Sequence, residues 1–222
     1  MICPDRMGFE SRSLVRSRFR ETFERYGVRT ADGFDLTEDL YKGCLANRLL
    51  FAGKSSVGQE IFELRRALDL LATLPEVDPG RLGAIGHSAG GQYAALTMYL
   101  DPRVGVACVS CGTFRYRDVF GRRDFLRPIN GFGGFVVPGM AGWGDMDDVL
   151  AGLAPRPYFE ASGDHADEAE AAELIARARA RYAALGAADR FQYVAYGAGH
   201  AFRADMRERA GAWIDRWLGH HV

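Results

Sequence analysis

The sequence has few cysteines and no long apolar stretch. Its four cysteines are too few and too scattered for a disulfide scaffold in a chain of 222 residues; they are Cys3, Cys44, Cys108 and Cys111. No stretch reaches the roughly 18 consecutive apolar residues that a membrane-spanning helix needs. Charged residues also interrupt residues 1–12, where a secretory signal would have an apolar core. We therefore expect reduced thiols and a cytoplasmic location.

An excess of charge of one sign is also missing. The 28 Lys and Arg residues nearly balance the 29 Asp and Glu residues, which gives a formal net charge of −1. Such a chain has no long-range field to attract nucleic acid or anionic lipid, so we expect neither a nucleic-acid nor a membrane partner. The zinc motif H-E-x-x-H and the phosphate loop are absent as well. We therefore expect no metal and no cofactor, and a small-molecule substrate.

One C-x-x-C motif, Cys108 to Cys111, raises the question of redox chemistry. Cys108 lies in the apolar run Val104–Val109. A small buried residue is the commoner explanation for a cysteine in such a run, and we prefer it to a redox pair.

Short apolar runs alternate with longer helical patterns along the chain. This order is typical of parallel strands joined by crossover helices, so we expect one α/β domain over residues 1–222, with helices on both faces of a mostly parallel sheet. The expected strands are Ile2–Cys3, Leu82–Ile85, Val104–Val109, Pro157–Ala161 and Arg190–Ala195. The expected helices are Val57–Leu74, Ala89–Leu100, Glu168–Leu185 and Met206–Leu218.

The segment of residues 114–155 differs from the rest because it is crowded with glycine, proline and aromatic residues. Between two strands, such a segment indicates an irregular, cap-like structure over a site. An ordinary surface loop is the alternative.

The sharpest motif is G-x-S-x-G at residues 86–90, between an expected strand and an expected helix. In this context the serine occupies a strained turn that exposes its hydroxyl, and side chains at the flanking glycines would collide with neighbouring backbone. Ser88 is therefore the candidate nucleophile. The amide of Ala89, at the helix N-terminus, is the candidate oxyanion donor. We expect His87 to line the substrate site.

A serine nucleophile needs a base and an acid further along the chain. His200 lies in a glycine-rich loop after the last expected strand and is the candidate base, with His165 as an alternative. The acid must orient the imidazole from the end of the preceding strand, where Asp164 and Asp167 compete. We favour Asp167, and expect the other aspartate to serve as a turn or helix N-cap residue.

Further stretches resemble one group of enzymes, the dienelactone hydrolase-like and acetyl xylan esterase-like bacterial α/β-hydrolases. The stretches are Pro75–Gly83 before the serine motif, Asp101–Arg103 after its helix, Ala154–Pro157 before the acid's strand and Gly199–Phe202 around the base. The resemblance covers nearly the whole chain. It implies an α/β-hydrolase fold and a carboxylic ester substrate.

The sequence departs from this group in two places. Residues 2–9 resemble the group's fourth strand and its following loop, which implies that the N-terminal strands are missing, together with the loop that donates the second oxyanion amide. An amide near Met7 and Gly8 is the expected substitute, and these two residues would also lie at the substrate site. A homodimer would cover the exposed sheet edge. In the acid loop, the group's pattern of Gly, two residues and Asp places Ala166 where Asp is usual.

The sequence therefore predicts a serine hydrolase that cleaves a small or medium carboxylic ester through an acyl-enzyme. Two alternatives remain open. A peptidase or acyl-peptide hydrolase would use the same triad on an amide. A non-catalytic remnant would serve as an interaction module, because a triad is able to persist after the oxyanion hole is lost.

Overall fold

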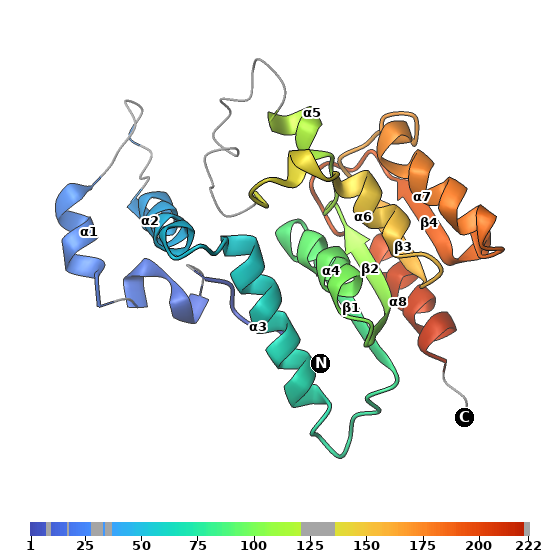
Figure 1. Cartoon of the computed structure of the whole chain (residues 1–222), viewed down its shortest axis with the longest axis horizontal. Helices are drawn as coiled ribbons and strands as arrows, with labels where there is room; N and C mark the ends of the chain where they lie inside the picture. The colour runs from blue at the N-terminus through green and yellow to red at the C-terminus, as the bar shows by residue number, and fades with distance from the viewer. Residues whose placement is uncertain (8–9, 17, 28–32, 34–36, 121–135, 220–222) are drawn as a thin grey trace. The chain divides into compact units, whose positions relative to one another are not determined.

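The computed structural model describes residues 1–219 except 8–9, 17, 28–32, 34–36 and 121–135 (Figure 1). Contacts divide the chain into two compact units. One consists of Met1–Ala67 with Arg122–Gly139, and the other of Leu68–Gly121 with Met140–Val222. The expected single domain over residues 1–222 stays a prediction. None of the described helices is long and apolar enough to cross a membrane.

The second unit contains a four-stranded parallel sheet. Its strands are β1 (Leu82–His87), β2 (Val104–Ser110), β3 (Tyr158–Ser162) and β4 (Phe191–Ala195), and they lie side by side in chain order. Each pairs in parallel with its neighbour. Parallel strands require crossover connections, which here contain helices. The four strands predicted after residue 80 are confirmed, with bounds that differ by one or two residues.

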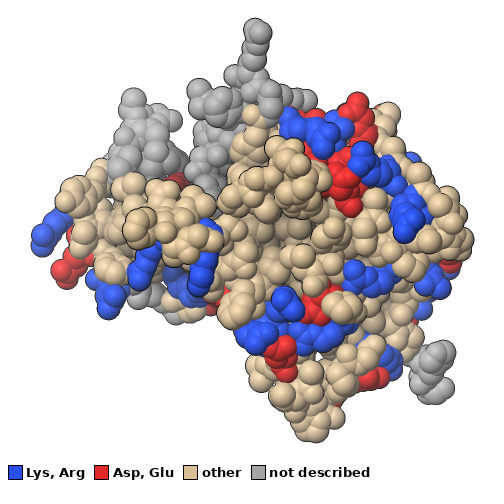
Figure 2. All heavy atoms as spheres, viewed as in Figure 1, with Lys and Arg blue, Asp and Glu red and all other residues tan. Residues whose placement is uncertain are grey.

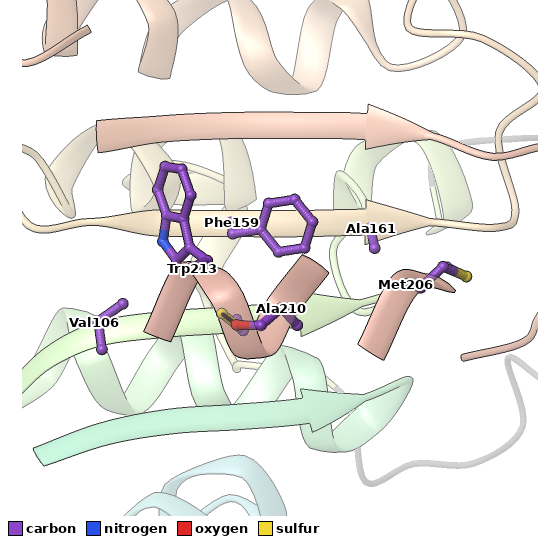
Figure 3. Packing of buried hydrophobic residues seen from close by; sticks show 7 residues of the cluster. Val106, Phe159, Ala161, Met206, Ala210 and Trp213 are labelled. Atoms are coloured by element: carbon purple, nitrogen blue, oxygen red, sulfur yellow. Dashed lines mark hydrogen bonds between the residues drawn. The ribbon is translucent and has the colours of Figure 1, made fainter. Parts of the chain in front are cut away.

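Helices cover both faces of this sheet, as expected. On one face lies α8 (Ala204–Leu218), whose Met206, Ala210 and Trp213 pack against β2 and β3 (Figure 3). Burial of this apolar side of α8 fixes the position of the helix, which follows the loop that carries His200. The opposite face carries α4 (Ala89–Leu100), α6 (Met146–Gly152) and α7 (Ala172–Ala184). The predicted helices in this unit are thereby confirmed, although α7 begins later than expected.

The described regular elements of the first unit are helical. They are two 3₁₀ turns (Glu10–Arg12 and Leu14–Arg16), α1 (Arg20–Tyr26), α2 (Thr37–Phe51) and α3 (Ser56–Leu71), whose end from Leu68 on belongs to the second unit. The expected helix Val57–Leu74 is confirmed as α3. The expected strand Ile2–Cys3 is wrong, because these residues have no regular structure. A strand needs a paired neighbour, and the Asp5 carboxylate instead closes a local turn by accepting from the Ser11 amide and hydroxyl.

The described part of residues 114–155 is more regular than expected. It forms α5 (Tyr116–Phe120), a 3₁₀ turn (Met140–Gly142) and α6, while residues 121–135 lie outside the description. Asp145 caps α6 by a capping box: its carboxylate accepts from the Asp148 amide, and the Asp148 carboxylate accepts from the Asp145 amide at 2.9 Å. Such a box satisfies amides that a helix start leaves unpaired. Whether this segment caps a site stays a prediction.

Charged side chains of both signs are interspersed on the face that Figure 2 shows. Several arginines there and elsewhere have acidic partners, as Arg103 has in Asp101 and Asp69, each at 2.7 Å. Close pairing of opposite charges leaves little long-range field, which agrees with the balanced composition.

Candidate active site

Ser88 lies at a sharp turn between β1 and α4. Its backbone φ is 56° and ψ is −126°, in a left-handed region that residues with a Cβ atom rarely adopt. Two backbone hydrogen bonds hold the turn: the Ser88 amide donates to the Ser110 carbonyl at 2.7 Å, and the Ser88 carbonyl accepts from the Gln92 amide at 3.1 Å. Strain of this kind persists only where the surroundings enforce it. The turn is the nucleophile elbow that the motif predicts.

The two glycines of the motif differ in what surrounds them. A Cβ atom at Gly86 would lie 2.2 Å from the backbone carbon and oxygen of Gly90, which no side chain can tolerate. A Cβ at Gly90 would meet no described atom within 4 Å, so the expected collision at this position is wrong. The next glycine, Gly91, is the tighter one, because its Cβ would lie 2.8 Å from a methyl of Val109. Close packing of the elbow therefore depends on Gly86 and Gly91.

Ser88, His200 and Asp164 form a continuous chain of hydrogen bonds. The Nε2 atom of His200 lies 2.8 Å from Ser88 Oγ, and its Nδ1 atom lies 3.0 and 3.1 Å from the two carboxylate oxygens of Asp164. The side chains of His200 and Asp164 are 52% and 41% exposed, so solutes reach them in this unit. This order of atoms suits proton removal from the serine, with the carboxylate fixing the imidazole tautomer.

The acid beside His200 is Asp164, whereas the sequence favoured Asp167. The Asp167 carboxylate accepts from the amides of Ala169 and Glu170, at 2.8 and 3.3 Å. It therefore closes the turn before α7, the role that we expected for the losing aspartate. Among the described residues, no hydrogen bond joins Asp167 to His200. The preference for Asp167 as the orienting acid is thus corrected.

The loop after β3, which carries Asp164 (the acid loop), lies against the loop after β4, which carries His200 (the base loop). They do so because the pairing of β3 and β4 continues past the strand ends. The Tyr196 amide donates to the Ser162 carbonyl at 2.8 Å, and the Ala198 amide donates to the Gly163 carbonyl at 2.9 Å. A Cβ at Gly163 would lie 2.1 Å from the Gly199 carbonyl oxygen. Residue 164 follows this contact directly, which explains why it, and no later residue, reaches His200.

The two expected oxyanion donors differ in whether their amides are already hydrogen-bonded. Ala89 is the first residue of α4, and the first amides of a helix have no partner within the helix, so its N–H is available beside Ser88. The Met7 amide, which we expected to be the second donor, donates to the Glu60 carboxylate at 2.9 Å, so that expectation is corrected. Gly8, the other expected residue, lies outside the described residues.

His87 lies directly behind His200. Its ring centroid is 4.9 Å from that of His200, and it stacks with Phe202 at 6.1 Å. Its Nδ1 atom is 3.1 Å from Ser110 Oγ. Burial lowers the pKa of His87, and the neighbouring imidazole of His200 lowers it further. The neutral form is therefore favoured beside the base. A role in substrate binding stays a prediction.

The other histidine that competed for the base is held elsewhere. His165 Nδ1 lies 2.5 Å from Tyr193 Oη and 3.2 Å from Ser162 Oγ, so the ring is held by the middle of β4 and the end of β3. His200, and not His165, is hydrogen-bonded to Ser88.

The described cysteines are all free. Cys108 is fully buried beneath α8, and burial raises its pKa to about 12, which suits an inert core residue. Cys111 is different, because its sulfur, a carboxylate oxygen of Asp164 and a ring nitrogen of His200 all lie within 4.8 Å of one another. This is a spacing that a metal ion would fit, although Asp164 and His200 are already joined to each other and to Ser88. No motif in the sequence places Cys111 at this site.

A parallel sheet with helices on both faces, together with a strained serine hydrogen-bonded to a histidine that contacts an aspartate, in the chain order serine, aspartate, histidine, defines the α/β-hydrolase class. The chain belongs to the alpha/beta hydrolase family, whose model matches residues 2–221.

The relatives are hydrolases and esterases by name. The chain is 30% identical over 198 residues to YtaP of Bacillus subtilis (strain 168), which carries the name of a hydrolase; the match covers 87% of this chain and 65% of YtaP. A glucuronoyl esterase from Solibacter usitatus superposes with a TM-score of 0.56 at 20% identity, over 73% of this chain and 49% of that one. The methylesterase BT1017 gives a TM-score of 0.58 at 20% identity, over 73% and 36%. At this identity the structures share a fold, and the chain spans only part of each relative.

Proposed function

We propose that the chain hydrolyses carboxylic esters of small or medium size, with Ser88 as nucleophile, His200 as general base and Asp164 as the acid that orients His200. The observation that carries this proposal is the unbroken contact from Asp164 through His200 to Ser88 Oγ, at 3.0 and 2.8 Å. A serine hydroxyl is a weak nucleophile until such a base takes its proton.

The proposed reaction has two steps. In the first, Ser88 Oγ attacks the ester carbonyl while its proton passes to Nε2 of His200, and the same proton then leaves with the alcohol as the C–O bond breaks. In the second, a water molecule attacks the acyl-enzyme and gives a proton to His200, which returns it to Ser88 Oγ as the acyl C–O bond breaks and the acid leaves. Asp164 stabilises the imidazolium in both steps. The Ala89 amide stabilises the oxyanion.

The names of the structural relatives support an ester substrate rather than an amide. The structural relatives reported above carry the names of a glucuronoyl esterase and a methylesterase. The stretches around the elbow and the base resemble those of dienelactone hydrolase-like and acetyl xylan esterase-like enzymes. These likenesses favour an ester of a carbohydrate or of another small molecule. They do not distinguish between acyl groups.

Turnover of p-nitrophenyl acetate by the purified chain tests the proposal. We expect hydrolysis that falls to background in Ser88→Ala and in His200→Ala, while aminoacyl anilides are left intact. His165→Ala is the matched control, because His165 was the alternative candidate for the base and has no hydrogen bond to Ser88 among the described residues. If His200→Ala hydrolyses the ester as fast as the parent, the interaction-module interpretation replaces this one.

A further inference from the structure

Cys111 follows β2 directly and adopts a backbone conformation that is costly for a residue with a side chain. Its φ is 50°, in the left-handed region that favours glycine. The residue is nearly buried, at 9% exposure. A glycine at this position would avoid the strain, so the retained side chain calls for a physical reason.

The Cys111 thiol touches both loops that carry the proposed base and acid. Its sulfur accepts the buried Gly163 amide at 3.1 Å, one residue before Asp164. It also donates towards the Ala201 carbonyl at 3.6 Å, one residue after His200. One S–H group therefore acts as acceptor for the acid loop and as donor to the base loop. Both contacts are made by a side chain at the end of a third strand, β2, next to the elbow.

The first of these contacts satisfies the Gly163 amide, which has no other hydrogen-bond partner among the described residues. A buried amide without a hydrogen-bond partner is costly, so the Gly163 N–H would turn towards another acceptor if the thiol were removed. Such a turn moves Asp164, the next residue along the chain, whose side chain is 41% exposed. A misplacement of about 1 Å in a catalytic group costs roughly 100-fold in rate.

We propose that Cys111 is a positioning residue whose thiol ties the acid loop to the base loop and so keeps Asp164 aligned with His200. The inference rests on the proposed ester hydrolysis. It assigns to the sulfur no bond to substrate and no redox step. Its consequence is a specific split: loss of the thiol lowers kcat and leaves KM unchanged, because the alignment of the base is disturbed while the substrate's own contacts are kept.

Three substitutions separate positioning from packing. Cys111→Ala removes the thiol, and Cys111→Gly removes it while also relieving the left-handed strain, so that this variant folds even if the alanine variant does not. Cys111→Ser restores one donor and one acceptor on a shorter bond. Cys108→Ala is the matched control, since it removes a buried thiol in β2 that donates to the Ala210 carbonyl of α8.

We expect kcat for p-nitrophenyl acetate to fall about 10- to 100-fold in Cys111→Ala and Cys111→Gly, with KM within about twofold of the parent. Cys111→Ser should recover to within about fivefold of the parent kcat, and Cys108→Ala should keep the parent kcat while lowering the melting temperature. The proposal is overturned if Cys111→Gly retains the parent kcat, or if Cys111→Ser is as impaired as Cys111→Gly.

A crystal structure of Cys111→Gly distinguishes failure of this inference from failure of the proposed function. We expect the closest separation between Asp164 and His200 Nδ1 to exceed hydrogen-bond range in the variant, whether or not the parent hydrolyses esters. An unchanged separation overturns the positioning role. If the contact is lost in Cys111→Gly and the parent turns over no ester, the positioning role stands and the proposed function is removed.

Discussion

Replacement of Asp164 by asparagine keeps the size of the side chain and removes its charge. The carboxylate oxygens lie 3.0 and 3.1 Å from His200 Nδ1, which places opposite charges close together when the imidazole is protonated. Unit charges about 4 Å apart attract by about 1 kcal/mol in water and about 4 kcal/mol at the effective dielectric constant of a protein surface. The pair is half exposed, so we take about 2 to 3 kcal/mol for the stabilisation of the imidazolium in the transition state. At 1.36 kcal/mol per tenfold, kcat should fall about 30- to 150-fold.

Steady-state hydrolysis of p-nitrophenyl acetate at pH 8 measures this effect, with Asp167→Asn as the matched control. Asparagine is nearly as good as aspartate at accepting backbone amides within a turn, so Asp167→Asn should stay within about twofold of the parent in kcat and close to it in stability. The opposite ranking, with Asp167→Asn the more impaired of the two, would show that the acid is assigned to the wrong aspartate. Equal kcat in Asp164→Asn and the parent would refute the orienting role altogether.

Two further predictions concern stability. Gly86→Ala should lower the free energy of unfolding by about 3 kcal/mol or more, because its Cβ would lie 2.2 Å from the Gly90 backbone, whereas Gly90→Ala should change it by less than about 1 kcal/mol; urea unfolding compares them. Glu160 is fully buried, and burial raises its pKa. A raised pKa in the folded state stabilises the fold fully below the unfolded value, near 4.5, and this contribution is lost as pH rises through the folded value. Between pH 4.5 and 7, the parent should therefore lose more stability in urea than Glu160→Gln; equal losses would contradict this assignment.

The sheet and the elbow were predictable because they depend on local patterns. Apolar runs of strand length bounded by turn residues identified β1 to β4, and the order of strand, glycine-flanked serine and helix fixed Ser88 at the turn. The glycine-rich loop after β4 identified His200 in the same way. Each of these signals lies within a few residues of the feature that it predicts.

The choice of acid was not predictable, because it depends on contacts between loops that are distant in the sequence. Asp164 and Asp167 are equivalent in residue type and both follow β3. What separates them is the close approach of Gly163 to Gly199, together with the Cys111 thiol that accepts the Gly163 amide. The sequence near residue 164 contains no signal of either contact. The role of Cys111 was missed for the same reason.

Some of the misses had a local signal. The start of α6 carries a readable capping box, Asp145 with Asp148, in a segment whose glycines and prolines favoured an irregular structure. The brief apolar pair Ile2–Cys3 was predicted as a strand in the same way as the four longer apolar runs. Two residues without a neighbouring strand have no pairing to stabilise them.

The site of covalent modification by a fluorophosphonate probe tests the central claim most directly, because the probe reacts with a serine only where a base activates it. Incubation of the purified chain with the probe, followed by proteolysis and mass spectrometry, should place a single phosphonyl group on Ser88. Labelling should disappear in Ser88→Ala and slow strongly in His200→Ala, while both variants keep the circular dichroism spectrum of the parent. A folded parent chain that stays unlabelled, or carries the adduct on another residue, would contradict the account.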